Sequence, residues 1–128
     1  MPAYDADFAT PPAPVAHVTV HNPDTAKSVT DVPMLLDTGA DVSLVPRVVL
    51  PPLGIEEEEV SASNVRLVGF DGSVSLAATV RLDLRVFAKT FRGEFVLTDS
   101  RYGVLGRDVL NHVRLIFDGP QLTWEENG

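Results

Sequence analysis

The sequence predicts an all-β fold, a closed barrel of short strands with a flap-like hairpin and one short C-terminal helix. Several short segments alternate apolar and polar residues or are rich in β-branched residues, as strands are. Turn-forming pairs such as Asp71-Gly72 and Gly119-Pro120 separate these segments. With 128 residues, of which 45% are hydrophobic and 22% charged, the chain has the size of one domain and can bury a core.

The N-terminal third predicts a tail and three strands. Residues 1–13 are small, polar and rich in proline, so we expect a flexible N-terminal tail. The segment 15–21 (VAHVTVH) alternates and is β-branched, which indicates a strand. After turn residues, the apolar run 32–37 (VPMLLD) predicts a strand that ends in a carboxylate, and 42–46 (VSLVP) predicts a short strand.

The middle of the chain predicts a helical turn and a hairpin. Residues 47–55 are compatible with one short helical turn, which the two prolines at 51 and 52 would end. The acidic run 56–59 (EEEE) indicates a solvated turn, with a functional acidic patch as the alternative. Residues 64–86 predict a hairpin, because two alternating segments flank Asp71-Gly72.

The C-terminal part predicts four further strands and the helix. Residues 92–99 (RGEFVLTD) indicate a strand. Residues 102–113 (YGVLGRDVLNHV) predict a short strand, then a glycine, then a short helix. The segments 113–118 and 121–126 predict strands on either side of the Gly119-Pro120 turn.

Composition excludes several partners and sites. The formal net charge is −8 and no basic patch is visible, so we expect neither nucleic acid nor an anionic membrane surface as a partner. The absence of cysteine excludes disulfides and thiolate catalysis. His17 and His21 would stand about 13 Å apart on one strand, too far to bind one metal ion, and no metal site is expected. No signal peptide or apolar run of roughly 18 residues is visible, so we expect a cytoplasmic protein.

Asp37 is the most informative residue, because it ends a strand expected to be buried. A buried carboxylate is costly unless it is paired, hydrogen-bonded or protonated. Thr38 adds a hydroxyl, and Gly39 permits a close approach of the backbone to another group. For the triplet alone, the simpler interpretation is a turn in which Asp37 caps nearby N–H groups.

Four segments together resemble one family. Residues 35–40 (LLDTGA) resemble the active-site loop of the retropepsin-like aspartic proteases, which include the retroviral proteases. Residues 103–110 (GVLGRDVL) resemble the family's second signature, which introduces its helix. Residues 68–73 (VGFDGS) fall where the family has its flap, and 115–124 (LIFDGPQLTW) resemble its last strands. The resemblance covers residues 14–126 and implies one domain with an acid-protease-type barrel.

This resemblance implies an aspartic endopeptidase that acts on an extended or unfolded peptide and needs no cofactor. The chain holds one such triplet, and 128 residues cannot hold two lobes of this kind. Activity would therefore require a homodimer in which the two copies of Asp37 meet at the twofold axis. Two adjacent carboxylates would share one proton and activate a water molecule between them.

The resemblance also assigns roles within the loop. Asp37, Thr38 and Gly39 would form the catalytic group, with Thr38 bonding across the axis to its copy. Ala40 would be the small residue beside the substrate.

Further residues would bind substrate or support the loop. Asp41 would shape one end of the cleft and pair with Arg107, so that the loop is braced against the helix; Gly106 and Asp108 would add structural support. The alternative is that Asp41 and Arg107 are unrelated surface charges. At the flap tip, the substrate contacts would come from Gly69, Phe70, Asp71 and Gly72.

Three alternatives stay open. The predicted flap could be an ordinary hairpin, since Phe70 and Asp71 depart from the glycine-rich tip of the retroviral enzymes. The chain could be a catalytically silent dimeric module that binds peptides or serves as a scaffold. It could also be an inactive subunit that a partner chain with its own triplet completes.

Overall fold

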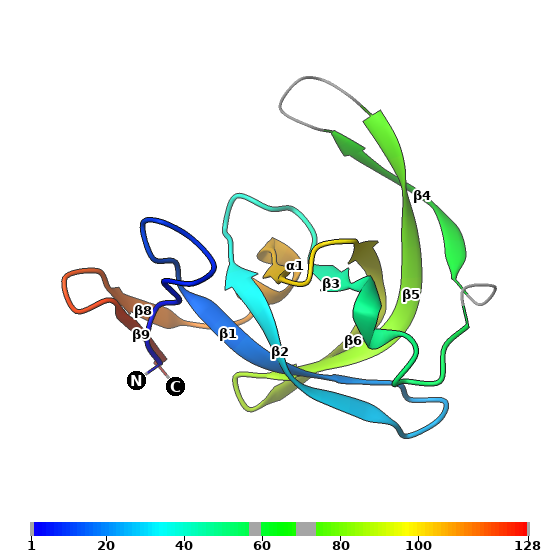
Figure 1. Ribbon diagram of the computed structural model, residues 1–128, viewed down its shortest axis with the longest axis horizontal. Helices are drawn as coiled ribbons and strands as arrows, with labels where there is room; N and C mark the ends of the chain where they lie inside the picture. Colours follow the sequence, from blue (N-terminus) through cyan, green and yellow to red (C-terminus); the bar gives the residue numbers. More distant parts are fainter. Residues whose placement is uncertain (1, 57–59, 69–73, 128) are drawn as a thin grey trace.

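The computed structural model describes residues 2–56, 60–68 and 74–127 (Figure 1). Its strands are β1 (Val15–His21), β2 (Ser28–Leu36), β3 (Leu44–Pro46), β4 (Ser61–Val68), β5 (Val74–Val86), β6 (Lys89–Thr98), β7 (Gly103–Leu105), β8 (Leu115–Asp118) and β9 (Thr123–Glu126). A 3-10 turn, η1 (Arg47–Val49), follows β3, and the short helix α1 (Arg107–Leu110) follows β7. The prediction of an all-β fold with one short helix near the C-terminal end is confirmed.

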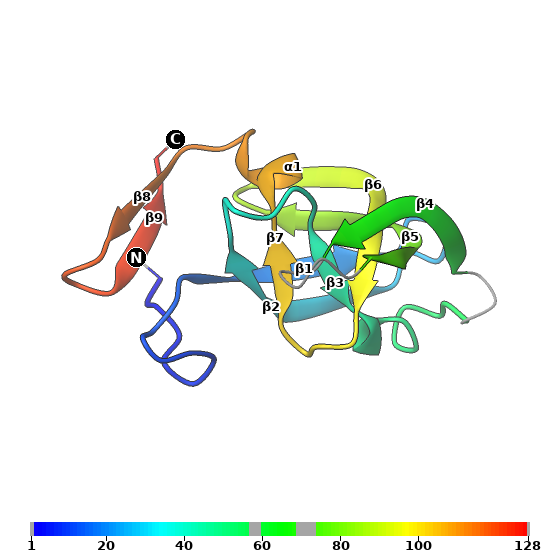
Figure 2. The same cartoon turned by 90° about the horizontal axis from the view of Figure 1, so that it is seen from above.

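Six strands close into the predicted barrel. Their order is β1-β2-β7-β3-β6-β5, and β5 pairs back onto β1, with residues 83–85 against residues 19–21. The pairs β2–β7 and β3–β6 are parallel, whereas the hairpin pairs are antiparallel. Seen from above, hairpin β8–β9 and the N-terminal segment stand to one side of the barrel (Figure 2).

The core follows from the alternation along the strands. On β1, Val18 and Val20 are fully buried while His17 is exposed. On β5, Leu82 and Leu84 are fully buried while Arg81 and Arg85 are exposed. Trp124 of β9 closes one end of the core, since it is only 5% exposed and its Nε1 donates to the Val15 carbonyl oxygen at 3.3 Å.

One turn between strands was missed by the sequence analysis. Strand β6 starts at Lys89 rather than at residue 92, because Phe87 and Ala88 form a two-residue turn to β5. Both residues have positive φ, 56° and 55°. Glycine or asparagine usually marks such a turn, since other residues rarely adopt this conformation, and neither is present.

The predicted flap hairpin is described in its arms only. Strands β4 and β5 pair from Ser61 opposite Thr79 to Val68 opposite Val74, and the hairpin extends away from the barrel (Figure 1). Residues 69–73, with the predicted tip and its Asp71-Gly72 turn, lie outside the described residues, as do residues 57–59 of the acidic run.

The N-terminal segment makes contacts that its composition does not reveal. Ala3 forms a bridge with Thr123 of β9, and Asp5 forms one with Ala13. The ring of Phe8 packs against that of Tyr102, with 4.4 Å between centroids. The expected flexibility of residues 1–13 stays a prediction. Within the described ranges, no helix has the length and apolar character required to cross a membrane.

An ion pair between buried Asp83 and largely exposed Arg92 joins β5 and β6. Asp83 is only 2% exposed, and its carboxylate accepts two hydrogen bonds from Arg92, Nε to Oδ1 at 2.8 Å and Nη2 to Oδ2 at 3.0 Å. These hydrogen bonds lower the pKa of Asp83 below its ordinary value, although burial opposes the shift. The two residues lie directly opposite each other across the hairpin, so the pair stabilises its register.

Replacing Arg92 by alanine is expected to lower the Tm by roughly 5 °C or more, because the Asp83 carboxylate stays buried without its partner. Since the pKa of Asp83 is lowered in the folded state, the pair stabilises fully above about pH 4 and less as the pH falls through the folded pKa. The Tm difference between wild type and Arg92→Ala should therefore shrink below about pH 4. Calorimetry at a series of pH values measures this Tm difference, and Arg81→Ala, which removes an exposed arginine of β5, is the control. A loss equal to that of Arg81→Ala would contradict a stabilising pair.

Candidate active site

The Asp37 carboxylate lies directly after β2 and is held by its own loop. The Asp37 N–H donates to the Leu105 carbonyl at 3.0 Å, which continues the parallel pairing of β2 and β7. Its Oδ1 accepts a hydrogen bond from the Gly39 N–H at 2.9 Å. Asp37 is half-buried, and no described residue donates to its Oδ2. One carboxylate oxygen is thus oriented by the loop and the other is available to a ligand.

Arg107, the first residue of α1, holds the loop at three points. Its Nη1 donates to the Thr38 carbonyl at 2.7 Å, and its Nη2 contacts Asp41 Oδ1. Its main-chain N–H donates to the Ala40 carbonyl at 2.9 Å. The Asp41–Arg107 ion pair implied by the resemblance is therefore present, and these are not unrelated charges. Both side chains are substantially exposed, so the pair contributes geometry more than free energy.

Ser43 is a supporting residue that the sequence analysis missed. It is fully buried, and its Oγ donates to Asp108 Oδ1 at 2.6 Å and accepts from the Gly106 N–H at 3.0 Å. Its main-chain N–H donates to Asp108 Oδ2 at 3.0 Å. Asp108 thus secures the far end of the loop while Arg107 secures its beginning. A serine before an apolar pair carries no sequence signal for this role.

Gly106 allows the loop and α1 to approach each other. A Cβ atom at this position would lie 2.7 Å from the carbonyl carbon and oxygen of Val42 and 2.9 Å from the Ala40 carbonyl oxygen. These are backbone atoms, which cannot move aside as a flexible side chain can. Gly106, Arg107 and Asp108 therefore act on the same loop from one short segment.

Replacing Gly106 by alanine is expected to lower the free energy of unfolding by about 1–3 kcal/mol, since the added methyl group displaces the loop backbone. Chemical denaturation measures the change. Gly119→Ala is the matched control, because a Cβ at Gly119 would meet nothing within 4 Å. Equal stability of the two variants would contradict this account of the loop.

Of the predicted substrate-binding residues, the structure places Ala40 and Asp41 next to Asp37. Half-buried Ala40 and exposed Asp41 lie in the loop after Asp37, beside α1. The predicted tip contacts at residues 69–72 lie outside the described residues. The described residues hold no group of three or more His, Cys, Asp or Glu side chains that could bind a metal ion.

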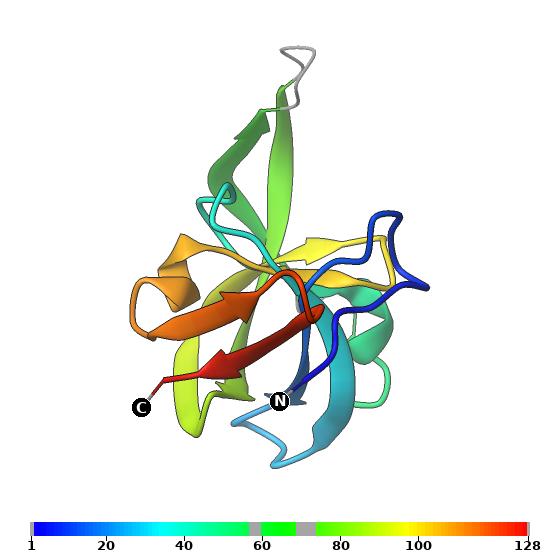
Figure 3. The same cartoon turned by 90° about the vertical axis from the view of Figure 1, so that its left-hand side faces the viewer.

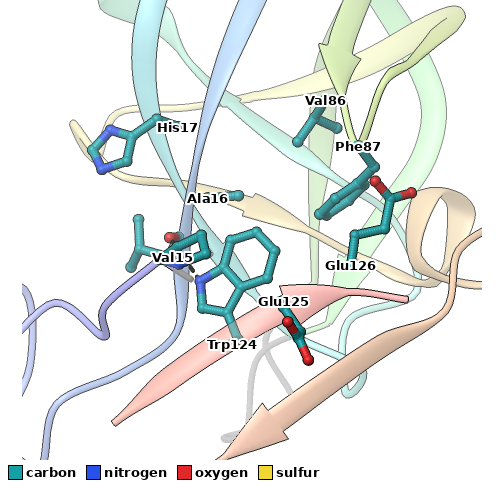
Figure 4. Close-up of a pocket in the computed structure, with 9 residues that line it drawn as sticks. Val15, Ala16, His17, Val86, Phe87, Trp124, Glu125 and Glu126 are labelled. Carbon is teal, nitrogen blue, oxygen red and sulfur yellow. Dashed lines mark hydrogen bonds between the residues drawn. The ribbon is translucent and has the colours of Figure 1, made fainter. Parts of the chain in front are cut away.

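A pocket of about 430 Å³ lies away from this loop (Figure 4). Buried Trp124 and Phe87 meet edge to face there, with 5.8 Å between ring centroids. His17, Glu125 and Glu126 also line it. None of its lining residues belongs to the segments 37–43 or 106–108, so this pocket is separate from the candidate active site.

Comparisons with known proteins agree with this architecture. The family model of the retroviral aspartyl protease matches residues 11–117. The EIAV protease, solved in complex with the inhibitor HBY-793, superposes with a TM-score of 0.60 at 19% identity, covering 85% of this chain and 91% of that one. A retropepsin-like aspartic protease from Rickettsia conorii superposes with a TM-score of 0.53 at 17% identity, covering 83% and 87%. A comparison with curated proteins gave no match.

Proposed function

The chain belongs to the retroviral aspartyl protease family, and on this basis we propose that it is an aspartic endopeptidase that acts as a homodimer. Members of this family are usually peptidases. The observation that carries the proposal is the Asp37 carboxylate, oriented through Oδ1 by Gly39 and open at Oδ2.

The need for a second copy follows from the chemistry. A single half-buried carboxylate cannot both accept a proton from water and donate one to the substrate carbonyl. Two copies of Asp37 across a twofold axis would supply one ionised and one protonated carboxyl, because two close negative charges repel. Exposed Thr38 would then meet its copy at the same axis.

One side of the molecule carries a candidate contact surface for this second copy. In Figure 3 the hairpin β8–β9 faces the viewer, and the loop that follows β2 lies above it. On this hairpin, Ile116, Phe117 and Leu122 are 43%, 45% and 44% exposed, although they are large and apolar. Ile116 and Phe117 are consecutive on β8 and therefore point to opposite faces of the hairpin, and exposed apolar residues on both faces of a projecting hairpin favour a protein interface. We call these three residues the hairpin patch.

Hydrolysis would proceed through a water molecule held between the two carboxyls. The ionised carboxylate takes a proton from the water, whose oxygen attacks the carbonyl carbon of the substrate. The protonated carboxyl gives its proton to the carbonyl oxygen. Transfer of a proton to the amide nitrogen then lets the C–N bond break, as in other aspartic proteases, with no covalent enzyme intermediate.

The arms β4 and β5 support an extended peptide as the substrate. Their hairpin extends from the barrel toward the same side as the loop that follows β2 (Figure 1). We propose that it closes over the peptide as a flap and pairs with its backbone, which requires an unfolded segment.

Cleavage of a peptide library, followed by mass spectrometry from acid to neutral pH, tests this function. Wild type should cut peptides at reproducible positions. Absence of cleavage by a protein confirmed as a dimer, together with saturable peptide binding, would favour the silent binding module instead.

A further inference from the structure

Another pocket, of about 330 Å³, lies at the base of the hairpin β8–β9. It is formed by the start of β6, the residues after α1 and the end of β9, which gather near the C-terminus in Figure 3. The structure describes seven residues that line it, and five of them carry side-chain nitrogen donors: Lys89, Asn111, His112, Arg114 and Asn127. Val113 and Glu126 complete the lining.

The charge of this pocket is opposite to that of the whole chain. The chain has a net charge of −8 with only ten Lys and Arg residues, and two of these, Lys89 and Arg114, line this pocket. Among the lining residues that the structure describes, Glu126 carries the one carboxylate, which already lies 4.0 Å from Lys89 Nζ. Within the described residues, no carboxylate lies at ion-pair distance from the Arg114 guanidinium. A positive charge therefore remains available to a ligand.

The backbone around these donors is held in place. The Asn127 N–H donates to the Arg114 carbonyl at 2.7 Å, which joins the two ends of the hairpin. The His112 N–H donates to the Val109 carbonyl at 3.0 Å, and its ring lies 6.3 Å from that of Phe91. The side chains of Lys89, His112 and Arg114 themselves are exposed. They can turn toward a ligand without rearrangement of the fold.

We propose that this pocket binds a phosphate group, either free or carried by a small molecule. Arginine and lysine donate charge-assisted hydrogen bonds to phosphate oxygens, and the amide and imidazole groups add further donors. Donors from three segments line the pocket, which suits the several oxygens of a tetrahedral phosphate better than the two oxygens of a planar carboxylate. The site is separate from the loop of Asp37 and lies at the base of hairpin β8–β9, at the end opposite Leu122 of the hairpin patch.

NMR titration of the full chain tests the site. Inorganic phosphate and glycerol phosphate are added in separate titrations at low ionic strength, since salt screens exposed charges over about 8 Å under physiological conditions. We expect saturable shifts of the amide signals of residues 111–114 and of Lys89 and Asn127. Arg114→Ala should weaken binding about tenfold, the loss expected for one charge-assisted hydrogen bond. Arg114→Lys should retain part of the affinity because it keeps the charge.

Lys27→Ala is the matched control, because it removes one exposed positive charge outside the pocket. Saturation by inorganic phosphate would identify the free ion as a ligand, and saturation by glycerol phosphate alone would identify a phosphoryl group on a carrier. Either result supports the site. Shifts that do not saturate, or an equal weakening in Lys27→Ala and Arg114→Ala, would overturn it.

Discussion

Replacing Asp37 by asparagine is expected to abolish peptide cleavage, with a loss of at least about a thousandfold. The amide cannot accept a proton from water, so the general base is lost. Its oxygen can still accept the hydrogen bond that Gly39 donates to Oδ1, and the loop should keep its geometry. Fold and dimer should therefore survive. Library cleavage and sedimentation of the purified variant measure activity and assembly separately.

Asp99→Asn is the matched control for this substitution. Its side chain is 93% exposed and pairs with Arg47 of η1, and neither residue makes one of the contacts described above for the loop of Asp37. The control should retain the activity of wild type. Cleavage by a pure preparation of Asp37→Asn at the rate of Asp99→Asn would remove Asp37 from the mechanism.

Placing a charge on the hairpin patch is expected to separate the subunits of the proposed homodimer and thereby to abolish the proposed peptide cleavage. In Ile116→Asp, the new carboxylate would be buried at the proposed interface without a partner, and in a symmetric dimer the change occurs twice. We expect the dimer to weaken by about a hundredfold or more. Activity should fall at low protein concentration and recover partly at high concentration, which sedimentation and cleavage assays can follow in parallel.

Val48→Asp controls for the effect of an exposed aspartate as such. Val48 is 65% exposed and lies in η1, not on the hairpin. This variant should remain dimeric and active. If Val48→Asp dissociated the dimer while Ile116→Asp left it intact, the interface would lie elsewhere on the molecule.

Much of the barrel was predictable because its strands alternate clearly. The bounds of β1 agree with the prediction, and β8 and β9 flank the predicted Gly119-Pro120 turn. The turn at Phe87 and Ala88 was not predictable, because neither residue favours positive φ. Because the position of this turn sets the register of β5 and β6, the pairing of Asp83 with Arg92 could not be predicted from the sequence either.

The site was predictable only where several motifs combine. A resemblance between distant segments indicated that Asp41 and Arg107 pair, and the structure shows this contact. The role of Ser43 was not predictable, because its contacts with Gly106 and Asp108 depend on how α1 packs against the loop. The catalytic roles of Asp37, Thr38 and Gly39 stay predictions.

Mixing the wild-type chain with Asp37→Asn at constant total protein tests the central claim, that each active site takes one Asp37 from each of two chains. If subunits exchange freely, an equal mixture holds about one quarter wild-type homodimers. Activity should then fall with the square of the wild-type fraction, to about a quarter at equal amounts. A linear fall, to about half, would show that one chain is sufficient and would contradict the shared site.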